Sequence, residues 1–566
     1  MTERTGSPQQ LSHADEIRQR IQRCNELKLQ IKTYEEELKK LDDHLQQAKT
    51  ELTLIEVSLN AEKLAQSQQR AVAQERDRAK LAAEQRECKN DPDMAAFVKD
   101  VEIHEPLDPR EAFFGGRTNC RWMHCKAKDE EKIRYIDICS LYPWVCKYGR
   151  FPVGHPEIFT ENFKDIKTRP YHGLVKCLVV APQALLHPVL PFRCGPKLLF
   201  HECRTCAETK QQGDCNHNEN ERQFWGAWAT PELYKAMDEG YVVKEIAEVY
   251  HYDKWEQYDQ ATGSGGLFTD YINCFLKIKQ QASGWPSWVK TEQDKDDYIR
   301  QYYEREGIRL EKDKIEYNGG LRMLAKLMLN SFWGKFGQRS AMTKTEYFKE
   351  PAKFLALIFD DTKKVMRVQM VHRDMMAVTY QVQDEFVQEL ENANPVIAAF
   401  VTAQARLKLY SYIKPLGERV LYMDTDSVIY VEKPDDIYKP QIGDYLGDMT
   451  DEIDGGYITE FVSAGPKQYA YRCINGDKVS SAIKMRGFSL THAASQHLNF
   501  NTLRSKVLAY LSDRKETGAV DIVAPKIARE SNCDVVTRTQ CKTYSIVYDK
   551  GRILPSGQVV PYGYKV

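Results

Sequence analysis

No segment of this 566-residue chain is long and apolar enough to cross a membrane as a helix. Its most apolar stretch, about 173–192, is interrupted by a lysine, a histidine and three prolines. The first residues are polar throughout and lack the apolar core of a secretory signal. The sequence therefore predicts a protein that has no membrane partner and is not secreted.

An excess of charge of either sign is also absent, because 80 Lys and Arg stand against 81 Asp and Glu. The resulting net charge of −1 excludes a uniformly basic protein but is compatible with a local basic groove. The 15 cysteines are an odd number with scattered spacing, which is typical of reduced thiols. We expect an intracellular protein, nuclear if the host is a eukaryote.

Proline and glycine are absent from residues 12–90, where Glu, Gln, Lys and Arg abound. Apolar residues follow one another there at alternating steps of three and four, a heptad pattern that predicts a coiled coil over 1–92 and a homo-oligomer. A solvated single helix or an artefact of gene prediction is the alternative. The apolar positions are Cys24, Leu27, Ile31, Tyr34, Leu38, Leu41, Leu45, Ala48, Leu52, Ile55 and Leu59.

From about residue 95 the composition changes to that of a mixed globular body, and the fold class is predicted as α+β. The β-like runs are Lys132–Ile138, Gly173–Val180, Val420–Met423, Val428–Val431 and Gln468–Arg472. The helix-like stretches are Asp296–Arg309, Leu321–Trp333 and Val396–Ile413.

Carboxylates follow two of these β-like runs. Asp137 ends the first run, where it is either a metal ligand or an ordinary helix cap. Asp424 and Asp426 lie one residue apart between two β-like runs, a pair that a cation usually holds, although a solvated turn is the alternative. Oxygen-only ligands favour Mg²⁺ or Mn²⁺ over Zn²⁺.

The stretch 321–333 carries cations that suit a polyphosphate. At about 100° per residue, the face expected to meet the polyphosphate consists of Arg322, Lys326, Asn330 and Trp333. Leu324, Leu327 and Met328 fall on the other side and are predicted to pack. A solvated surface helix is the alternative. Together, the acids and cations suit phosphoryl transfer by two divalent ions.

Three motifs in this order resemble the A, B and C motifs of family B DNA polymerases. They are Asp137-Ile-Cys-Ser-Leu-Tyr-Pro143, Lys326-Leu-Met-Leu-Asn-Ser-Phe-Trp-Gly334 and Tyr422-Met-Asp-Thr-Asp-Ser427. Phe113-Phe-Gly-Gly116 and Lys467-Gln-Tyr469 resemble two motifs of the protein-primed branch. The amino-acid sequences of residues 465–471 and 484–490 most resemble those of the Maverick/Polinton transposon enzymes.

The resemblance covers about 100–566 and implies a right-hand polymerase with palm, fingers and thumb, preceded by the coiled coil. It implies a DNA-directed DNA polymerase that joins dNMP from dNTP to a primer 3′-OH on a DNA primer-template, with two Mg²⁺ or Mn²⁺ ions. A terminal priming protein is a further expected partner. Asp137 and Asp426 are then the metal ligands, and Asp424 is the supporting catalytic carboxylate.

The resemblance assigns further roles. The expected dNTP-binding residues are Tyr142, which excludes a 2′-OH, with Arg322, Lys326, Asn330 and Trp333. The expected DNA-binding residues are Phe113, Gly115, Gly116, Lys467, Tyr469, Lys484, Arg486 and Gly487. Two positions depart from the pattern, because Phe113 and Trp333 stand where Tyr is more usual.

The layout implied is a chain of eight segments. They are the coiled coil 1–92, a linker with the template-strand motif and first palm strand 93–136, palm motif A 137–150, an insertion contacting the priming protein 151–295, fingers 296–338, a second insertion 339–385, palm with motif C 386–490 and thumb 491–566. No exonuclease acids precede Phe113. We therefore expect primer extension without 3′→5′ degradation.

A zinc site is a separate hypothesis. Cys203 and Cys206 are separated by two residues, as in one half of a zinc knuckle. Cys215 and His217 follow after a further eight residues. Reduced surface thiols with a solvated histidine are the alternative.

Two other functions remain open at this point. A reverse transcriptase or an RNA-synthesising polymerase shares the two-metal palm, but Tyr142 and the Asp-Thr-Asp-Ser sequence argue against both. A decayed transposon product would use the coiled coil for assembly and DNA binding, with a vestigial palm.

Overall fold

The computed structural model describes Gln22, Arg23 and residues 105–388, 390–488, 490–530 and 534–565. The predicted heptads and the rest of 1–92 lie outside the described residues, apart from Gln22 and Arg23. Residues 104–383 and 387–566 form one unit, and only that unit is considered below. Among the described residues, no helix combines the length and apolarity that a membrane crossing needs.

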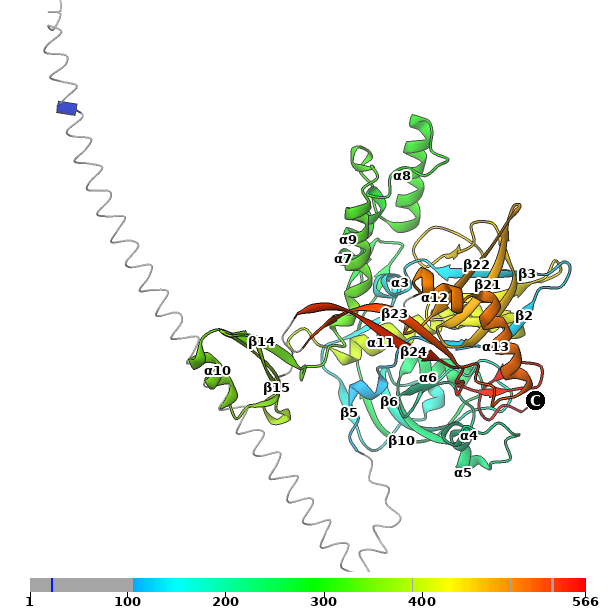
Figure 1. Cartoon of the computed structure of the whole chain (residues 1–566), viewed down its shortest axis with the longest axis horizontal. Helices are drawn as coiled ribbons and strands as arrows, with labels where there is room; N and C mark the ends of the chain where they lie inside the picture. The colour runs from blue at the N-terminus through cyan, green and yellow to red at the C-terminus, as the bar shows by residue number, and fades with distance from the viewer. Residues whose placement is uncertain (1–21, 24–104, 389, 489, 531–533, 566) are drawn as a thin grey trace, which may run out of the picture. The chain divides into compact units, whose positions relative to one another are not determined.

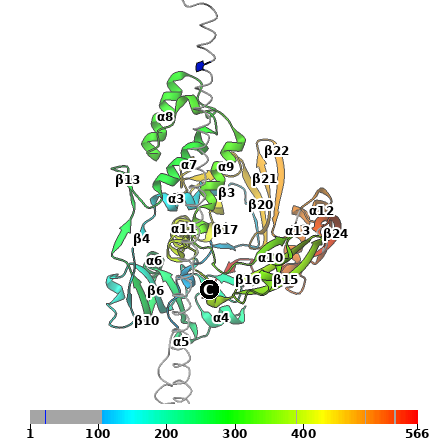
Figure 2. The ribbon, with the colours of Figure 1, turned by 90° about the vertical axis from the view of Figure 1, so that its left-hand side faces the viewer.

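A nine-stranded antiparallel sheet forms the centre of the described residues (Figures 1 and 2). Its main order is β1-β17-β18-β3-β20-β21-β22, while β19 pairs with β3 and β2 pairs with β20. The bounds are β1 Thr118–Cys120, β2 His124–Lys126, β3 Lys132–Ile138, β17 Val420–Asp424, β18 Ser427–Glu432, β19 Met449–Asp451, β20 Tyr457–Gly465, β21 Gln468–Asn475 and β22 Lys478–Met485.

Both faces of the central strands are covered. In β3, Ile133 and Tyr135 point into one apolar cluster, whereas Ile136 and Ile138 point into the other. This alternation follows from the period of two in a strand. Near-continuous apolar runs such as Val420–Met423 therefore mark strands that are buried on both sides.

On one face lies the 22-residue helix α11 (Pro395–Leu416), which is buried along most of its length. Asn394 caps it by accepting a hydrogen bond from the Ile397 amide at 3.1 Å. The same cluster includes a four-stranded sheet and helix α6 (Thr230–Asp238). The sheet consists of β5 Glu157–Phe159, β10 Val242–His251, β6 Gly173–Val180 and β9 Phe224–Ala229, in that order.

Small elements connect these layers. They are η1 Pro109–Ala112, β4 Phe151–Val153, η2 Ile166–Thr168, β7 Phe192–Cys194, β8 Lys197–Leu199, α4 Arg204–Thr209, α5 Glu219–Arg222, β11 Lys254–Glu256, β12 Tyr258–Asp259, β13 Ser264–Gly265, η3 Lys312–Lys314 and η6 Gly417–Arg419. The short turn η5 Asp384–Phe386 is not part of this unit.

A group of helices stands beside the sheet (Figure 1). It comprises α3 Leu141–Tyr148, α7 Thr269–Gln281, α8 Glu292–Glu306, α9 Gly319–Ser331 and the short turn η4 Trp333–Lys335. Helix α7 packs along α9. Helix α7 thus lies inside the range 151–295 that the sequence assigned to the insertion, while it packs along α9 of the predicted fingers.

The predicted packing side of α9 is wrong. Leu324 and Leu327 are 55% and 60% exposed, whereas Ala325 and Leu329 are buried. The reason is that α7 and α3 contact the helix about a third of a turn away from the side that the apolar residues alone indicated.

The remaining elements follow α9. The strands β14 Lys344–Phe348, β15 Lys363–His372 and β16 Met375–Val382 form a separate sheet with α10 Pro351–Ile358, inside the predicted second insertion. The range 491–566 holds α12 His492–His497, α13 Phe500–Ser512, β23 Val520–Arg529, β24 Val535–Tyr544, β25 Arg552–Ile553 and β26 Val559–Val560. Its last part, 549–565, forms backbone hydrogen bonds to the insertion and to Arg121.

Candidate active site

Two carboxylates from distant parts of the chain meet at the end of the central strands. Asp137 is the penultimate residue of β3, and its register partner is Ser427 at the start of β18. Asp426 lies in the turn between β17 and β18, where its carbonyl accepts a hydrogen bond from the Ile138 amide at 2.7 Å. The preceding Thr425 has a left-handed backbone (φ +61°), which makes this turn tight.

The electrostatics of these two carboxylates favour a cation. Burial and then the nearby charge of Asp426 raise the pKa of Asp137 to about 7. Burial also raises the pKa of Asp426 to about 6. In the described part of the chain neither carboxylate forms a salt bridge with a lysine or arginine. Two partly desolvated, unpaired carboxylates are the donor set that a divalent ion needs.

Asp424 has different surroundings. Its carboxylate accepts hydrogen bonds from Lys467 Nζ at 2.8 and 3.0 Å and from Thr118 Oγ1 at 2.8 Å. Strand β1 supplies Thr118, because Thr118 is the register partner of Asp424. Asp424 is thus neutralised by the protein, whereas Asp137 and Asp426 are not.

The residues predicted to contact the primer strand also come together. Lys484 and Tyr469 are register partners in β22 and β21, and both contact the Tyr135 hydroxyl at 3.1 Å. The Arg486 amide donates to the Lys467 carbonyl at 2.9 Å. At Gly487 the backbone is left-handed (φ +85°), with open space around the Cα.

Three aromatic rings line the other side of the site. Tyr142, in the first turn of α3, stacks on Trp333 with ring centroids 4.4 Å apart. Phe113 meets Trp333 edge-on at 6.4 Å. The predicted template residue and the predicted nucleotide residues therefore form one cluster.

The two glycines after Phe114 differ in what surrounds them. A Cβ at Gly116 would lie 2.6 Å from Thr425 Oγ1, so glycine is required for this segment to approach the turn between β17 and β18. Gly115 has no atom within 4 Å of such a Cβ, which leaves room for a ligand. Arg406 of α11 fixes the segment by donating to the carbonyls of Phe114 and Gly115 at 2.8 and 3.0 Å.

The cations of α9 face the same region. Lys326 acts electrostatically on Asp137, and Arg322 donates to Ser283 Oγ at 3.1 Å. Asn330 lies on the exposed side of the helix. The structure adds Lys279 of α7, whose Nζ donates to Ser140 Oγ at 3.4 Å. Burial lowers the pKa of Lys279, and Arg322 and Lys326 lower it further.

Sequence reasoning missed Lys279 because no motif surrounds it. Only the packing of α7 along α9 brings it to the other cations. Glu452 was missed for the same reason: it acts on both Asp137 and Asp426, and it follows β19, which pairs with β3.

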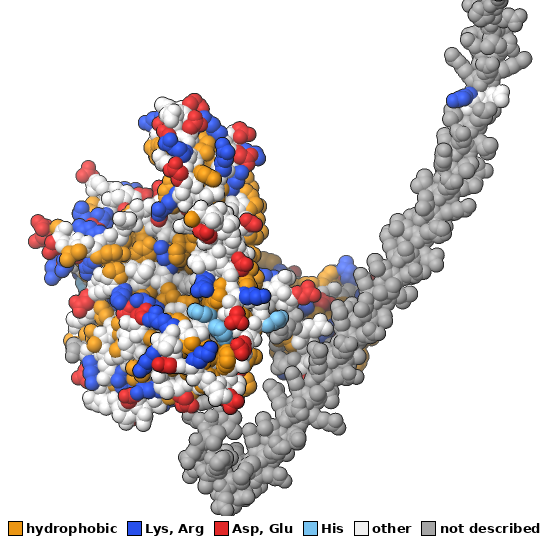
Figure 3. All heavy atoms as spheres, turned by 180° about the vertical axis from the view of Figure 1, so that it is seen from behind, with side chains coloured by type: hydrophobic (Ala, Val, Ile, Leu, Met, Phe, Trp, Pro, Cys, Tyr) orange, Lys and Arg blue, Asp and Glu red, His pale blue; other side chains and the backbone are white. Residues whose placement is uncertain are grey.

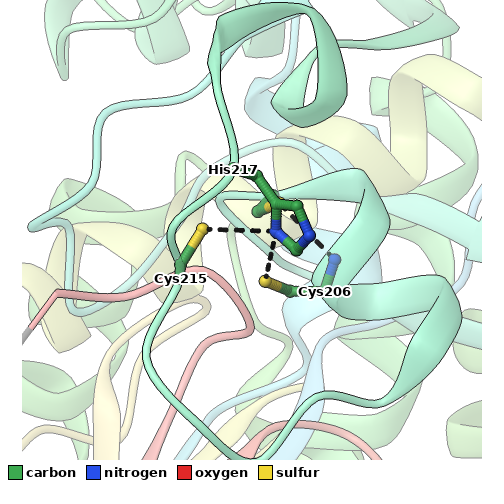
Figure 4. A group of neighbouring side chains, drawn as sticks. Cys206, Cys215 and His217 are labelled. Atoms are coloured by element: carbon green, nitrogen blue, oxygen red, sulfur yellow. Dashed lines mark hydrogen bonds between the residues drawn. The ribbon is translucent and has the colours of Figure 1, made fainter.

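A second cluster of donor atoms lies in the insertion. The ligand atoms of Cys203, Cys206, Cys215 and His217 all lie within 4.8 Å of one another. All three cysteines are buried. Figure 4 shows the sulfurs of Cys206 and Cys215 pointing to the ring of His217.

A family model described as DNA polymerase type B, organellar and viral, matches residues 108–291 and 284–417, which is more than half of the chain. The chain belongs to this family. The matched residues include Asp137, Tyr142 and α9 but end before Asp424 and Asp426.

Two curated fungal proteins are similar to this chain, and both are named probable DNA polymerase. The one from Neurospora intermedia is 22% identical over 370 residues, covering 63% of the chain and 30% of that protein. The one from Podospora anserina is 23% identical over 406 residues, covering 66% of the chain and 28% of that protein. The chain thus spans less than a third of these relatives.

Solved structures of phi29 DNA polymerase are also similar. One crystal form has a TM-score of 0.47 at 16% identity, covering 78% of the chain and 62% of that protein. A ternary complex with primer-template DNA and incoming nucleotide has a TM-score of 0.46 at 17% identity, covering 82% of the chain and 66% of that protein.

Proposed function

We propose that this chain is a DNA-directed DNA polymerase that transfers dNMP from a dNTP to a primer 3′-OH with Mg²⁺ or Mn²⁺. The observation that carries the proposal is the meeting of Asp137, near the end of β3, with Asp426, in the turn before β18, both partly desolvated and unpaired. Membership of the type B family supports it.

Asp137 and Asp426 are the residues that would hold two divalent ions. When bound, such ions activate the primer hydroxyl and stabilise the leaving pyrophosphate. Asp424, held by Lys467 and Thr118, fixes the turn that carries Asp426. The role of Asp424 is therefore positioning, and its loss should reduce activity less than the loss of Asp137 or Asp426.

The nucleotide fits between the aromatic cluster and the cations. Tyr142, stacked on Trp333, presents a ring where the sugar of the incoming nucleotide would lie. Arg322, Lys326 and Lys279 supply positive charge for the triphosphate. Asn330, on the same helix, extends this surface.

The DNA would lie across the site. Phe113, with the open space at Gly115, suits a template base, because an aromatic ring stacks any base and glycine permits close approach. Lys467, Tyr469, Lys484, Arg486 and Gly487 suit the primer strand. Protein priming and a Maverick/Polinton origin are the finer parts of this proposal, and they rest on the motifs at 113–116, 465–471 and 484–490.

The test is primer extension by the purified chain with Mg²⁺. We supply dNTPs or NTPs on a DNA template and, separately, on an RNA template. Extension with dNTPs on DNA supports the proposal. Extension mainly with NTPs, or mainly on RNA, would contradict it in favour of another polymerase class. DNA binding without any extension would indicate a decayed enzyme.

A further inference from the structure

The Cys/His cluster of the insertion has the geometry of a metal centre. His217 Nδ1 lies 3.5, 3.3 and 3.7 Å from the sulfurs of Cys203, Cys206 and Cys215. A tetrahedral zinc ion, with Zn–S of about 2.3 Å and Zn–N of about 2.0–2.1 Å, separates sulfur from nitrogen by about 3.6 Å. The three observed distances lie within 0.3 Å of this value.

Hydrogen bonding alone does not account for this arrangement. One ring nitrogen has either a single hydrogen or a single lone pair, so it cannot bond to three thiols at once. A cation at the centre satisfies all four donors together. The Cys206 amide also points to Cys203 Sγ at 3.4 Å, which stabilises a thiolate.

We propose that Cys203, Cys206, Cys215 and His217 bind a structural zinc ion. Three sulfur donors and one imidazole favour Zn²⁺ over the oxygen-preferring Mg²⁺, and four protein ligands leave no open position for catalysis. This site is independent of the polymerase proposal, because none of its ligands contacts the active site.

The zinc ion would fix the loop that holds the end of the chain. Between the two ligand pairs, Gln212 donates to the Gly551 carbonyl at 3.3 Å and accepts from the Ile553 amide at 3.0 Å. Asp214 pairs with Arg552 at 2.6 Å. Two residues of this loop are therefore joined directly to three consecutive residues of the segment 549–565.

The ligands themselves also contact the segment 549–565. A Cβ at Gly563 would lie 2.5 Å from Cys203 Cβ, so only glycine fits there. The neighbouring Glu202 amide donates to the Tyr562 carbonyl at 2.8 Å, and Tyr562 shares an apolar cluster with the three cysteines.

The same segment contacts β1, beside the catalytic turn. The Lys550 carbonyl accepts from Asn119 Nδ2 at 3.3 Å, and Lys550 Nζ donates to the Thr118 carbonyl at 3.4 Å. Thr118 in turn donates to Asp424. Zinc in the insertion would thus stabilise the packing of residues 549–565 against β1, which we call the closure.

The metal content of the full chain tests the site. We expect about one zinc per chain after purification without chelator, and a visible spectrum of tetrahedral cobalt thiolate after exchange with Co²⁺. Cys206→Ser and His217→Ala should lose the zinc. Cys194→Ser is the matched control, because Cys194 packs against the same cluster without being a ligand. It should keep the zinc.

Hydrogen exchange of the parent protein tests the closure and needs no variant. Removing zinc should increase the exchange of the Ile553 and Lys565 amides, whose acceptors lie in the insertion. A parent that carries no zinc and takes up neither Zn²⁺ nor Co²⁺ would overturn the site. Unchanged exchange of 549–565 after zinc removal would overturn the closure.

Discussion

Three aspartates within one site differ because of their neighbours. Asp424 has Lys467 and Thr118 as hydrogen-bond donors. Asp137 and Asp426 are partly buried, lie close enough to repel, and have pKa values raised to about 7 and about 6. A raised pKa means that protons compete with metal near neutral pH.

We therefore expect metal binding to weaken as the pH falls. Both carboxylates are ionised at pH 8, whereas at pH 6 Asp137 is mostly protonated and Asp426 is about half protonated. Mn²⁺ affinity, measured by electron paramagnetic resonance without DNA, should fall roughly tenfold between these two pH values. Affinity that is the same at pH 6 and pH 8 would refute the assignment of these two ligands.

Tyr142 is the residue expected to select the sugar. Tyr142→Val removes the ring that stacks on Trp333 and should reduce discrimination against ribonucleotides by roughly 10–100-fold. Tyr142→Phe keeps the ring and should discriminate like the parent. The measurement is the ratio of kcat/KM for dNTP and NTP. Equal ratios in the parent and Tyr142→Val would assign the selection to another residue.

At the scale of elements, α11 and α6 hold the segment 113–116 in place. Arg406 forms a buried pair with Glu232, with two contacts of 2.7 Å, and its remaining donors hold the carbonyls of Phe114 and Gly115. A helix of the insertion thus supports the segment 113–116, the proposed template contact, which is far away in the sequence.

Glu232→Ala should destabilise the fold by about 3–5 kcal/mol, because it leaves the buried Arg406 charge unpaired. Asp238→Ala, on the same helix, removes the exposed pair with Arg169 and should cost no more than about 1 kcal/mol. Urea unfolding of both variants measures the difference. Equal costs would show that the Arg406 pair does not support the fold.

Sequence reasoning predicted the elements better than their packing. The strand Lys132–Ile138 and the helices near 321–333 and 396–413 were foreseen from periodicity. The buried side of α9 and the packing of α7 along α9 were not, because both depend on contacts that form only in the folded chain. Asp137 and Asp426 lie in recognisable sequence motifs, whereas Lys279, Arg406 and Glu452 do not.

At the scale of the whole molecule, charges of both signs are interspersed over the face that Figure 3 shows, in keeping with a net charge of −1. Any attraction for DNA therefore has to come from local groups such as Lys467, Lys484 and Arg486. The insertion, the segment 549–565 and β1 form one connected support for the turn that carries Asp426.

The heptad pattern of residues 24–59 lies outside the described residues and remains a sequence prediction. Deleting 1–92 should convert an oligomer into a monomer without loss of basal primer extension, because the pattern contains no catalytic residue. Sedimentation of both chains at micromolar concentration is the measurement. A full-length chain that sediments as a monomer would contradict the prediction.

The most direct test of the central claim is primer extension by Asp426→Asn with Mg²⁺. This change keeps the size of the side chain but removes the charge of one proposed metal ligand. We expect a fall of roughly 10³-fold or more in the extension rate, with DNA binding retained. The matched control is Asp435→Asn, an exposed carboxylate after β18, which should extend like the parent. Near-normal extension by Asp426→Asn would contradict the account.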